Sequence, residues 1–275
     1  MIWFKEFSNP WKPDSHFIMC EKIILLITIL VQTYLAPFID SFVPSYDINF
    51  GDSFIMVGFI CDLYFALDIL LTFHISYYNQ GELISETKTI AIHYLKTSFI
   101  PDVISLLSLI GYMSEGSKDF ILLSLLRLHQ LPALASRIED YFQFSRQFGS
   151  FFQLIKLVVF VLIVAHFISC IQYIIIKDDL ASSWLSLANV DTGTTFDRYV
   201  ASLYWSIATM ATVGFGDIYP TNTKERLTTI CVMIVSSIVF GYILSSIGSL
   251  LMEMSNYSNE SRYFTFVYYN FVERK

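Results

Sequence analysis

Charged residues are scarce in this sequence, and their scarcity limits what the protein can be. Only 15% of the 275 residues are Asp, Glu, Lys or Arg, whereas 55% are hydrophobic. The formal net charge is −7, so the chain lacks the basic excess that nucleic-acid binding requires. The composition excludes an ordinary soluble domain and a nucleic-acid partner, and it favours a polytopic membrane protein in contact with lipid.

Cysteine and histidine are also few. The four cysteines stand singly within or beside apolar segments, without the paired short spacings of a zinc site or the density of a disulfide framework. The five histidines show no His-Glu-x-x-His spacing, so a membrane enzyme or proton-coupled transporter built on them is disfavoured. The N-terminus lacks the pattern of a signal peptide. We expect no enzymatic activity and no cofactor.

What the sequence does contain is a series of apolar blocks, most of them long enough to cross a bilayer. The third and fourth blocks are short. The predicted spans are Phe17–Phe38, Phe54–Tyr77, Phe99–Met113, Phe120–Ala135, Phe152–Ile176 and Leu227–Met252. This pattern predicts an all-α membrane protein with six transmembrane helices.

The long connection between the fifth and sixth spans has two halves. Its first half is polar, whereas Arg198–Met210 is amphipathic and helix-like. A helix of this length is too short to cross a bilayer, so we expect it to enter and leave the membrane on one side.

Basic residues predict the orientation of the chain. With six spans both termini lie on one side, and that side receives more basic residues than the opposite, more acidic loops. These basic residues are Lys5, Lys12, Lys22, Lys88, Lys96, Arg137, Arg146, Arg262, Arg274 and Lys275. The positive-inside rule therefore predicts cytoplasmic termini. Acidic loops on the other side could concentrate cations, or they could simply be solvated.

The string TVGFGD, Thr212 to Asp217, follows the short amphipathic helix. A potassium ion that enters a narrow pore must exchange its water for a ladder of backbone carbonyl oxygens. Gly214 and Gly216 permit the backbone dihedrals that such a ladder needs, and Thr212 can add its hydroxyl. Val213 and Phe215 are expected to point away from the ion path and pack behind the filter. The one metal ion that we expect this chain to bind is K⁺, held by the backbone carbonyls of the filter.

A short Gly-containing string can also be a simple turn at the start of a loop. Here the string follows a Trp-containing amphipathic helix, lies between two predicted spans and is followed by Pro220. The preceding helix would also direct the negative end of its dipole toward the ion path. This combination favours a potassium selectivity filter, with Asp217 at its mouth.

The pore stretch SLYWSIATMATVGFGDIYPTN, Ser202 to Asn222, resembles the pore of the ether-à-go-go and cyclic-nucleotide-binding-domain channel superfamily. The resemblance extends over Cys61–Leu107, which is similar to that superfamily's second and third helices, and over AHFISCIQY, Ala165–Tyr173, which is similar to its fifth. It implies a voltage-gated-like potassium channel whose four subunits, identical or mixed, surround one pore in the plasma membrane or another membrane derived from the cell surface.

The resemblance also implies a division of the chain. The expected segments are a cytoplasmic N-terminal segment at 1–16, a voltage-sensor-like domain at 17–148, a pore domain at 149–254, and the start of a C-linker-like segment at 255–275. The cyclic-nucleotide-binding β-roll of the superfamily does not follow in this sequence, so we expect no cyclic-nucleotide site in this chain.

Four residues match the superfamily's charge-transfer centre or its surroundings. By resemblance, the ring of Phe65 and the carboxylates of Asp68 and Asp102 receive gating arginines, and Asp62 is a further acid on the same helix. Acidic residues within membrane spans are functional candidates on physical grounds as well. Simple packing remains open for Phe65, and a water-facing position near a helix end remains open for Asp62.

The fourth span departs from the superfamily. It keeps Arg127 but has Gln130, Ala133 and Ser136 where further basic residues would continue the series, and Pro132 is expected to interrupt the helix. Arg127 is then the residual gating charge, or else a static partner of the acids.

The sequence therefore predicts a subunit that conducts K⁺ passively, with weak or absent voltage dependence. By resemblance, Phe240 and Leu244 of the sixth span line the inner cavity. The alternative is a non-conducting or modulatory subunit that assembles with a full-length channel.

Overall fold

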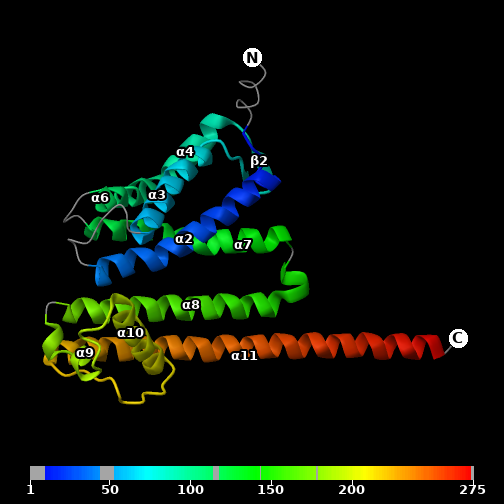
Figure 1. Cartoon of the computed structure of the whole chain (residues 1–275). Coiled ribbons are helices and arrows are strands. Elements are labelled where there is room, and N and C mark those ends of the chain that lie inside the picture. Colours follow the sequence, from blue (N-terminus) through cyan, green and yellow to red (C-terminus); the bar gives the residue numbers. More distant parts are fainter. Residues whose placement is uncertain (1–9, 44–52, 114–117, 143, 178, 274–275) are drawn as a thin grey trace. The chain divides into compact units, whose positions relative to one another are not determined.

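The structure, a computed structural model, describes residues 10–43, 53–113, 118–142, 144–177 and 179–273. The chain forms two compact units, residues 1–142 and 143–275. Both are helical, as Figure 1 shows, and the prediction of an all-α membrane protein is confirmed. Among the basic residues used to predict the orientation, Lys5, Arg274 and Lys275 lie outside the described residues.

The first unit holds the helices of the predicted sensor-like part. Its elements are α2 (His16–Phe42), α3 (Ser53–Thr72), β1 (Tyr77–Asn79), β2 (Glu82–Ile84), α4 (Thr87–Thr97), α5 (Phe99–Ser105), α6 (Ser108–Met113), the 3₁₀ helix η2 (Lys118–Gln130) and α7 (Leu131–Phe142). α2 begins after Ser15, whose side chain accepts a hydrogen bond from the Ile18 amide and caps the helix. Two apolar clusters hold this unit together, one around Ile55 and Tyr112 and one around Leu25 and Phe65.

The second predicted span is shorter than expected. α3 ends at Thr72, and Tyr77, the expected end of the span, begins an antiparallel hairpin in which Tyr77 pairs with Ile84. Gln80 and Gly81 both adopt positive φ, 51° and 89°, which is the turn geometry that two-residue hairpins favour. The apolar character of the block did not distinguish its last residues from a continuation of the helix.

The fourth predicted span is broken into two kinds of helix. η2 is a 3₁₀ helix of 13 residues, longer than such helices usually run, and it gives way to the α-helix α7 at Leu131. Pro132 lies in the first turn of α7, where its missing N–H needs no partner. The predicted interruption at Pro132 is therefore confirmed as a change of helix type.

The second unit is built around two long helices, with three shorter helical elements between them in the sequence. Its elements are α8 (Phe144–Ile176), η3 (Leu180–Ser182), α9 (Trp184–Leu187), α10 (Thr195–Met210) and α11 (Thr223–Glu273). Figure 1 shows α8 beside α11, with α10 packed against both. Ala165 and Ile168 of α8, Met210 of α10 and Val232 and Val239 of α11 form their shared core.

Four of the described helices are long and apolar enough to cross a membrane. They are α2, α3, most of α8 and the first 30 residues of α11. The third predicted span is divided between α5 and α6, and α4 meets this pair at a bend of 66°. The third and fourth spans are the two that were expected to be short.

Candidate functional site

The short helix α10 delivers the chain to the filter string. Thr194 and Asp197 form a capping box at its start: the Thr194 amide donates to Asp197 Oδ2 at 2.9 Å, and the Asp197 amide donates to Thr194 Oγ1 at 3.3 Å. The Thr194 hydroxyl also donates to Asp197 Oδ2, at 2.6 Å, and this bond, together with the one from the Thr194 amide, holds the pKa of Asp197 below its usual range. At the other end the amides of Val213 and Gly214 both donate to the Ala208 carbonyl, at 3.0 and 3.2 Å. The start of the filter string is therefore fastened to the last turn of α10.

The backbone of the filter string alternates in handedness. Thr212, Gly214 and Gly216 have φ of 58°, 54° and 76°, while Val213 and Phe215 between them keep negative φ. Positive φ suits the two glycines but is strained for a β-branched threonine, and such strain persists only where the surroundings impose it. A backbone whose φ alternates in sign directs successive carbonyl groups to the same side. A ladder of carbonyl oxygens requires this arrangement.

Side chains beside the filter string link it to α10. The Tyr204 hydroxyl donates to Asp217 Oδ2 at 2.8 Å and holds the pKa of Asp217 below its usual range. The rings of Tyr204 and Phe215 stack, with centroids 6.2 Å apart and planes 4° apart. Phe215 thus stacks on α10 on one side, but it is 70% exposed and Val213 is 54% exposed in the single chain, so their expected packing behind the filter stays a prediction.

Phe240 and Leu244 both lie on α11, one helical turn apart. Leu244 is exposed and Phe240 is half-buried within the single chain. They therefore share one face of the helix, and their predicted place in a cavity depends on neighbouring subunits.

A buried charge cluster lies in the first unit, centred on Arg127 of η2. This guanidinium is fully buried. Its Nη1 forms an ion pair with Asp68 Oδ2, its Nη2 donates to the Phe65 carbonyl at 3.0 Å, and its Nε donates to Ser105 Oγ at 3.3 Å. The guanidinium carbon lies 4.7 Å from the centroid of the Phe65 ring, a cation–π contact. Phe65 thus both packs in the core and contacts the cation.

Asp102 of α5 faces the same arginine at a longer distance. Its Oδ1 lies 3.7 Å from Arg127 Nε and accepts a hydrogen bond from Gln130 Nε2 at 2.6 Å, while its Oδ2 accepts one from the Tyr94 hydroxyl at 2.8 Å. The structure therefore brings together Phe65, Asp68, Asp102 and Arg127.

Asp62 does not join this group. It is fully buried, so the water-facing interpretation of this residue is wrong. Its carboxylate accepts hydrogen bonds from Gln32 Nε2 at 2.6 Å and from the Ser108 hydroxyl, and Tyr112 in turn donates to Gln32 Oε1 at 3.3 Å. Asp62 lies one helical turn and a half before Asp68 on α3 and belongs to a separate polar network.

Sequence reasoning missed a second cation in the charge cluster. Lys22 was counted with the basic residues of the cytoplasmic side, but its side chain extends from α2 into the interior and is buried. Its Nζ lies 2.9 Å from Asp68 Oδ1 and 3.1 Å from Glu21 Oε2. A lysine inside an otherwise apolar helix was the available signal. Tyr204, the partner of Asp217, was missed as well, and nothing in its spacing marked it.

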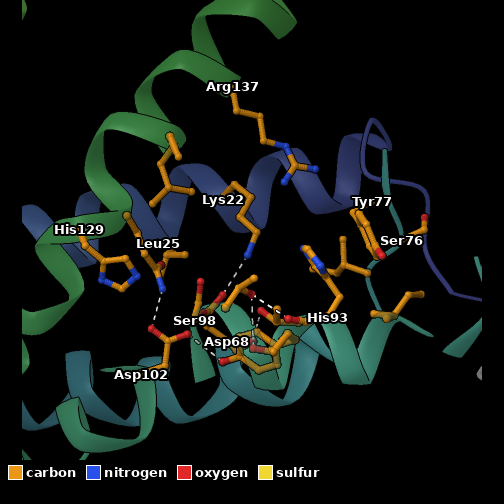
Figure 2. A pocket seen from close by; sticks show the side chains of 18 residues that line it. Lys22, Leu25, Asp68, Ser76, Tyr77, His93, Ser98, Asp102, His129 and Arg137 are labelled. Atoms are coloured by element: carbon orange, nitrogen blue, oxygen red, sulfur yellow. Dashed lines mark hydrogen bonds and ion pairs between the residues drawn. The ribbon is translucent and has the colours of Figure 1, made fainter. Parts of the chain in front are cut away.

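A cavity of about 330 Å³ adjoins the cluster. Figure 2 shows Lys22, Asp68, Asp102, His93 and His129 around it. Within the described part of the chain, no group of three or more His, Cys, Asp or Glu side chains is placed to hold a metal ion.

Comparisons with known proteins agree with this geometry. Residues 19–259 match the family described as ion transport protein. The chain is 29% identical over 252 residues to "Potassium channel AKT1" of Arabidopsis thaliana, which covers 87% of this chain and 28% of that protein. It is 30% identical over 278 residues to "Potassium channel AKT2/3" of the same plant, covering 95% of this chain and 33% of the relative.

An animal relative is similar at about the same identity over a smaller part of the chain. "Potassium voltage-gated channel protein eag" of Drosophila melanogaster is 30% identical over 234 residues, covering 74% of this chain and 20% of that protein. The chain thus spans a third or less of the length of each of these relatives. The family match, at residues 19–259, contains both the filter string and the charge cluster.

Proposed function

Because this chain belongs to the ion transport protein family, within the superfamily of voltage-gated-like potassium channels, we propose that it is one subunit of a four-fold pore that conducts K⁺ passively and selectively. Members of this family are ion channels, so the chain is a multi-pass membrane protein and not an enzyme. The observation that carries the proposal is the alternation of φ along Thr212–Gly216.

Each part of the pore has a role in this proposal. The carbonyls of Thr212, Val213, Gly214 and Phe215 replace the water of the permeant ion, together with the Thr212 hydroxyl. Gly216 ends the ladder. α10 directs its negative C-terminal end toward the ions, which lowers the electrostatic cost of removing their water.

The flanks of the ladder complete the conduction path. The carboxylate of Asp217 lies just beyond Gly216 and attracts cations to the entrance of the filter. At the opposite end, Phe240 and Leu244 of each α11 face the inner cavity of the tetramer. K⁺ is the permeant ion and not a cofactor.

In the sensor-like unit, Phe65, Asp68 and Asp102 hold Arg127. Among the residues of η2, Arg127 is the single arginine, and Lys118 at the first position is the single lysine. We expect gating to depend weakly on voltage, because so little charge lies on this segment. The tetramer is formed by copies of this chain or with related subunits, in a plasma membrane or another membrane derived from the cell surface, with both termini cytoplasmic.

The direct test is the ion selectivity of the chain expressed in cells that have little potassium current of their own. The reversal potential should follow the K⁺ gradient and ignore Na⁺. A reversal potential that follows Na⁺ would refute the selectivity. If current appears only when a full-length channel subunit is co-expressed, and a filter variant of this chain leaves that current unchanged, the chain is a modulatory subunit instead.

A further inference from the structure

Lys22 is a buried ammonium group that the proposed gating scheme does not use. It lies on α2, and only 9% of its side chain is exposed. Its Nζ contacts Asp68 Oδ1 at 2.9 Å and Glu21 Oε2 at 3.1 Å. An ammonium group is desolvated at considerable cost, so it is kept buried only where carboxylates repay that cost.

Asp68 is shared between two cations that come from different helices. Its Oδ1 faces Lys22 of α2, and its Oδ2 pairs with Arg127 of η2. Asp68 is itself only 2% exposed. This carboxylate therefore binds two cations at once. Arg127 is on the segment that carries the residual gating charge, and Lys22 is not.

The 3₁₀ geometry of η2 shows at which position the helix lacks a second positive charge. In a 3₁₀ helix residues three apart lie on one face, so Ser124, Arg127 and Gln130 form a row. Gln130 follows Arg127 in that row, lines the cavity beside Asp68, and offers only a neutral amide, which bonds to Asp102. Ala133 lines the same cavity without a polar group.

We propose that Lys22 is a stationary replacement for the positive charge that the fourth segment lacks at position 130, and that it keeps Asp68 paired when Arg127 moves. The inference rests on the proposed function only in assigning movement to Arg127. In Figure 2 the Lys22 side chain reaches from α2 across the edge of the cavity to Asp68. Without Lys22, departure of Arg127 would leave a buried carboxylate with no ion-pair partner, which is strongly unfavourable.

The first experiment moves the charge from α2 to η2 and measures stability. In the full chain, purified as its assembled oligomer, Lys22→Met should lower the thermal unfolding midpoint, because it keeps the length of the side chain but removes its charge. Adding Gln130→Arg to Lys22→Met should restore most of the midpoint. Gln130→Arg alone should be less stable than the double variant, because three cations then compete for Asp68 and Asp102.

Two controls make this test specific. Lys22→Arg keeps the charge on α2 and should resemble the wild type. Ser136→Arg adds the same charge on α7, at an exposed residue that does not line the cavity with Asp68, and it should not restore Lys22→Met. Equal stability of Lys22→Met and wild type, or equal rescue by Ser136→Arg and Gln130→Arg, would overturn the proposal.

The second experiment measures gating. In the Lys22→Met, Gln130→Arg double variant the second charge sits on the segment that moves, so the conductance–voltage curve should steepen by up to about twofold. An unchanged slope in a double variant that folds and conducts would overturn the division into stationary and mobile charges. Absence of potassium current from every variant would instead refute the proposed function, while the stability measurements would still decide the role of Lys22.

Discussion

At the scale of single residues, the filter string depends on backbone conformations that most side chains resist. Gly214 has φ of 54°, and nothing lies within 4 Å of where its Cβ would be. Glycine is therefore required at this position for its backbone conformation and not because of crowding within the chain. The left-handed region costs an L-residue roughly 1–2 kcal/mol, and the pore repeats that cost in four subunits.

Gly214→Ala should therefore abolish potassium current while the protein still reaches the membrane. Gly241→Ala is the matched control, because Gly241 lies in α11 without positive φ and with equally open surroundings. Current should be recorded together with surface labelling of both variants. Normal current through Gly214→Ala would show that the positive φ is not needed for conduction.

Asp217 permits a prediction about acid. The hydrogen bond from Tyr204 lowers the pKa of Asp217 below its ordinary value of 3.8. The bond to the carboxylate is therefore fully present above pH 3.8 and is lost as the pH falls through the lowered pKa. Acidifying the solution at this end of the filter from about pH 7.5 to about pH 5 should leave Asp217 charged.

Tyr204→Phe keeps the ring that stacks on Phe215 but removes the donor. The pKa of Asp217 should rise toward its ordinary value, so the loss of current on acidification should move to higher pH. Tyr219→Phe, at a nearby exposed tyrosine, serves as the control. Superimposable acid profiles for wild type and Tyr204→Phe would contradict this role of the hydroxyl.

At the scale of elements, the contact between α3 and α6 depends on a residue without a side chain. A Cβ added to Gly58 would lie 2.6 Å from Cζ of Tyr112, a residue that is only 1% exposed and that donates to Gln32. The same contact positions the polar network around Asp62. α3 and α6 can approach closely only because position 58 is glycine.

Gly58→Ala should destabilise the protein by about 1–3 kcal/mol through overpacking. A lower thermal unfolding midpoint of the purified oligomer is the expected result. Adding Tyr112→Leu, which shortens the opposing side chain, should recover part of the loss. If Gly58→Ala unfolds at the wild-type temperature, the close approach of the two helices is not required.

At the scale of the whole molecule, the second unit is incomplete as a single chain. Only 17% of the apolar window in Thr223–Met252 is buried within the chain, and Leu244 and many of its neighbours on α11 are exposed. Lipid and neighbouring subunits of a tetramer would cover this surface. The filter and cavity faces then lie at the centre of four copies.

The small charge of η2 limits how strongly voltage can control such a tetramer. One elementary charge that crosses the field contributes about 2.3 kcal/mol per 100 mV, so four copies of Arg127 supply at most about 9 kcal/mol, compared with roughly 30 kcal/mol for 3 to 4 charges in each subunit. The conductance–voltage curve should be shallow. A curve as steep as that of a channel with a full arginine series would refute this prediction.

Arg127→Gln separates a residual sensor from a static ion pair. If Arg127 moves, the variant should flatten the curve further. If it only holds the unit together, gating should be unchanged while folding is impaired, because a buried ion pair that loses one partner is destabilised by about 3 kcal/mol or more. Leu126→Ala, at an exposed residue of the same helix that does not line the cavity, controls for changes that do not affect the charge cluster.

The sequence by itself predicted the class of the protein, which the comparisons confirm, and it marked the proposed filter and most members of the buried charge cluster. Apolar blocks of bilayer length leave few alternatives to helices in lipid, and alternating glycines in TVGFGD specify a local backbone that needs no distant contacts. Pro132 and the missing basic residues of the fourth segment were equally visible, because they too are local features.

The tertiary structure alone decided which charges meet. Lys22 and Asp68 are 46 residues apart, and although a lysine inside an apolar helix is a local signal, nothing local shows which carboxylate it reaches. The same holds for Asp62, which packing assigns to Gln32 and Ser108 and not to Arg127. Pairing in a buried site depends on how helices cross, and it is there, where water cannot replace a missing partner, that each pairing affects stability and gating most.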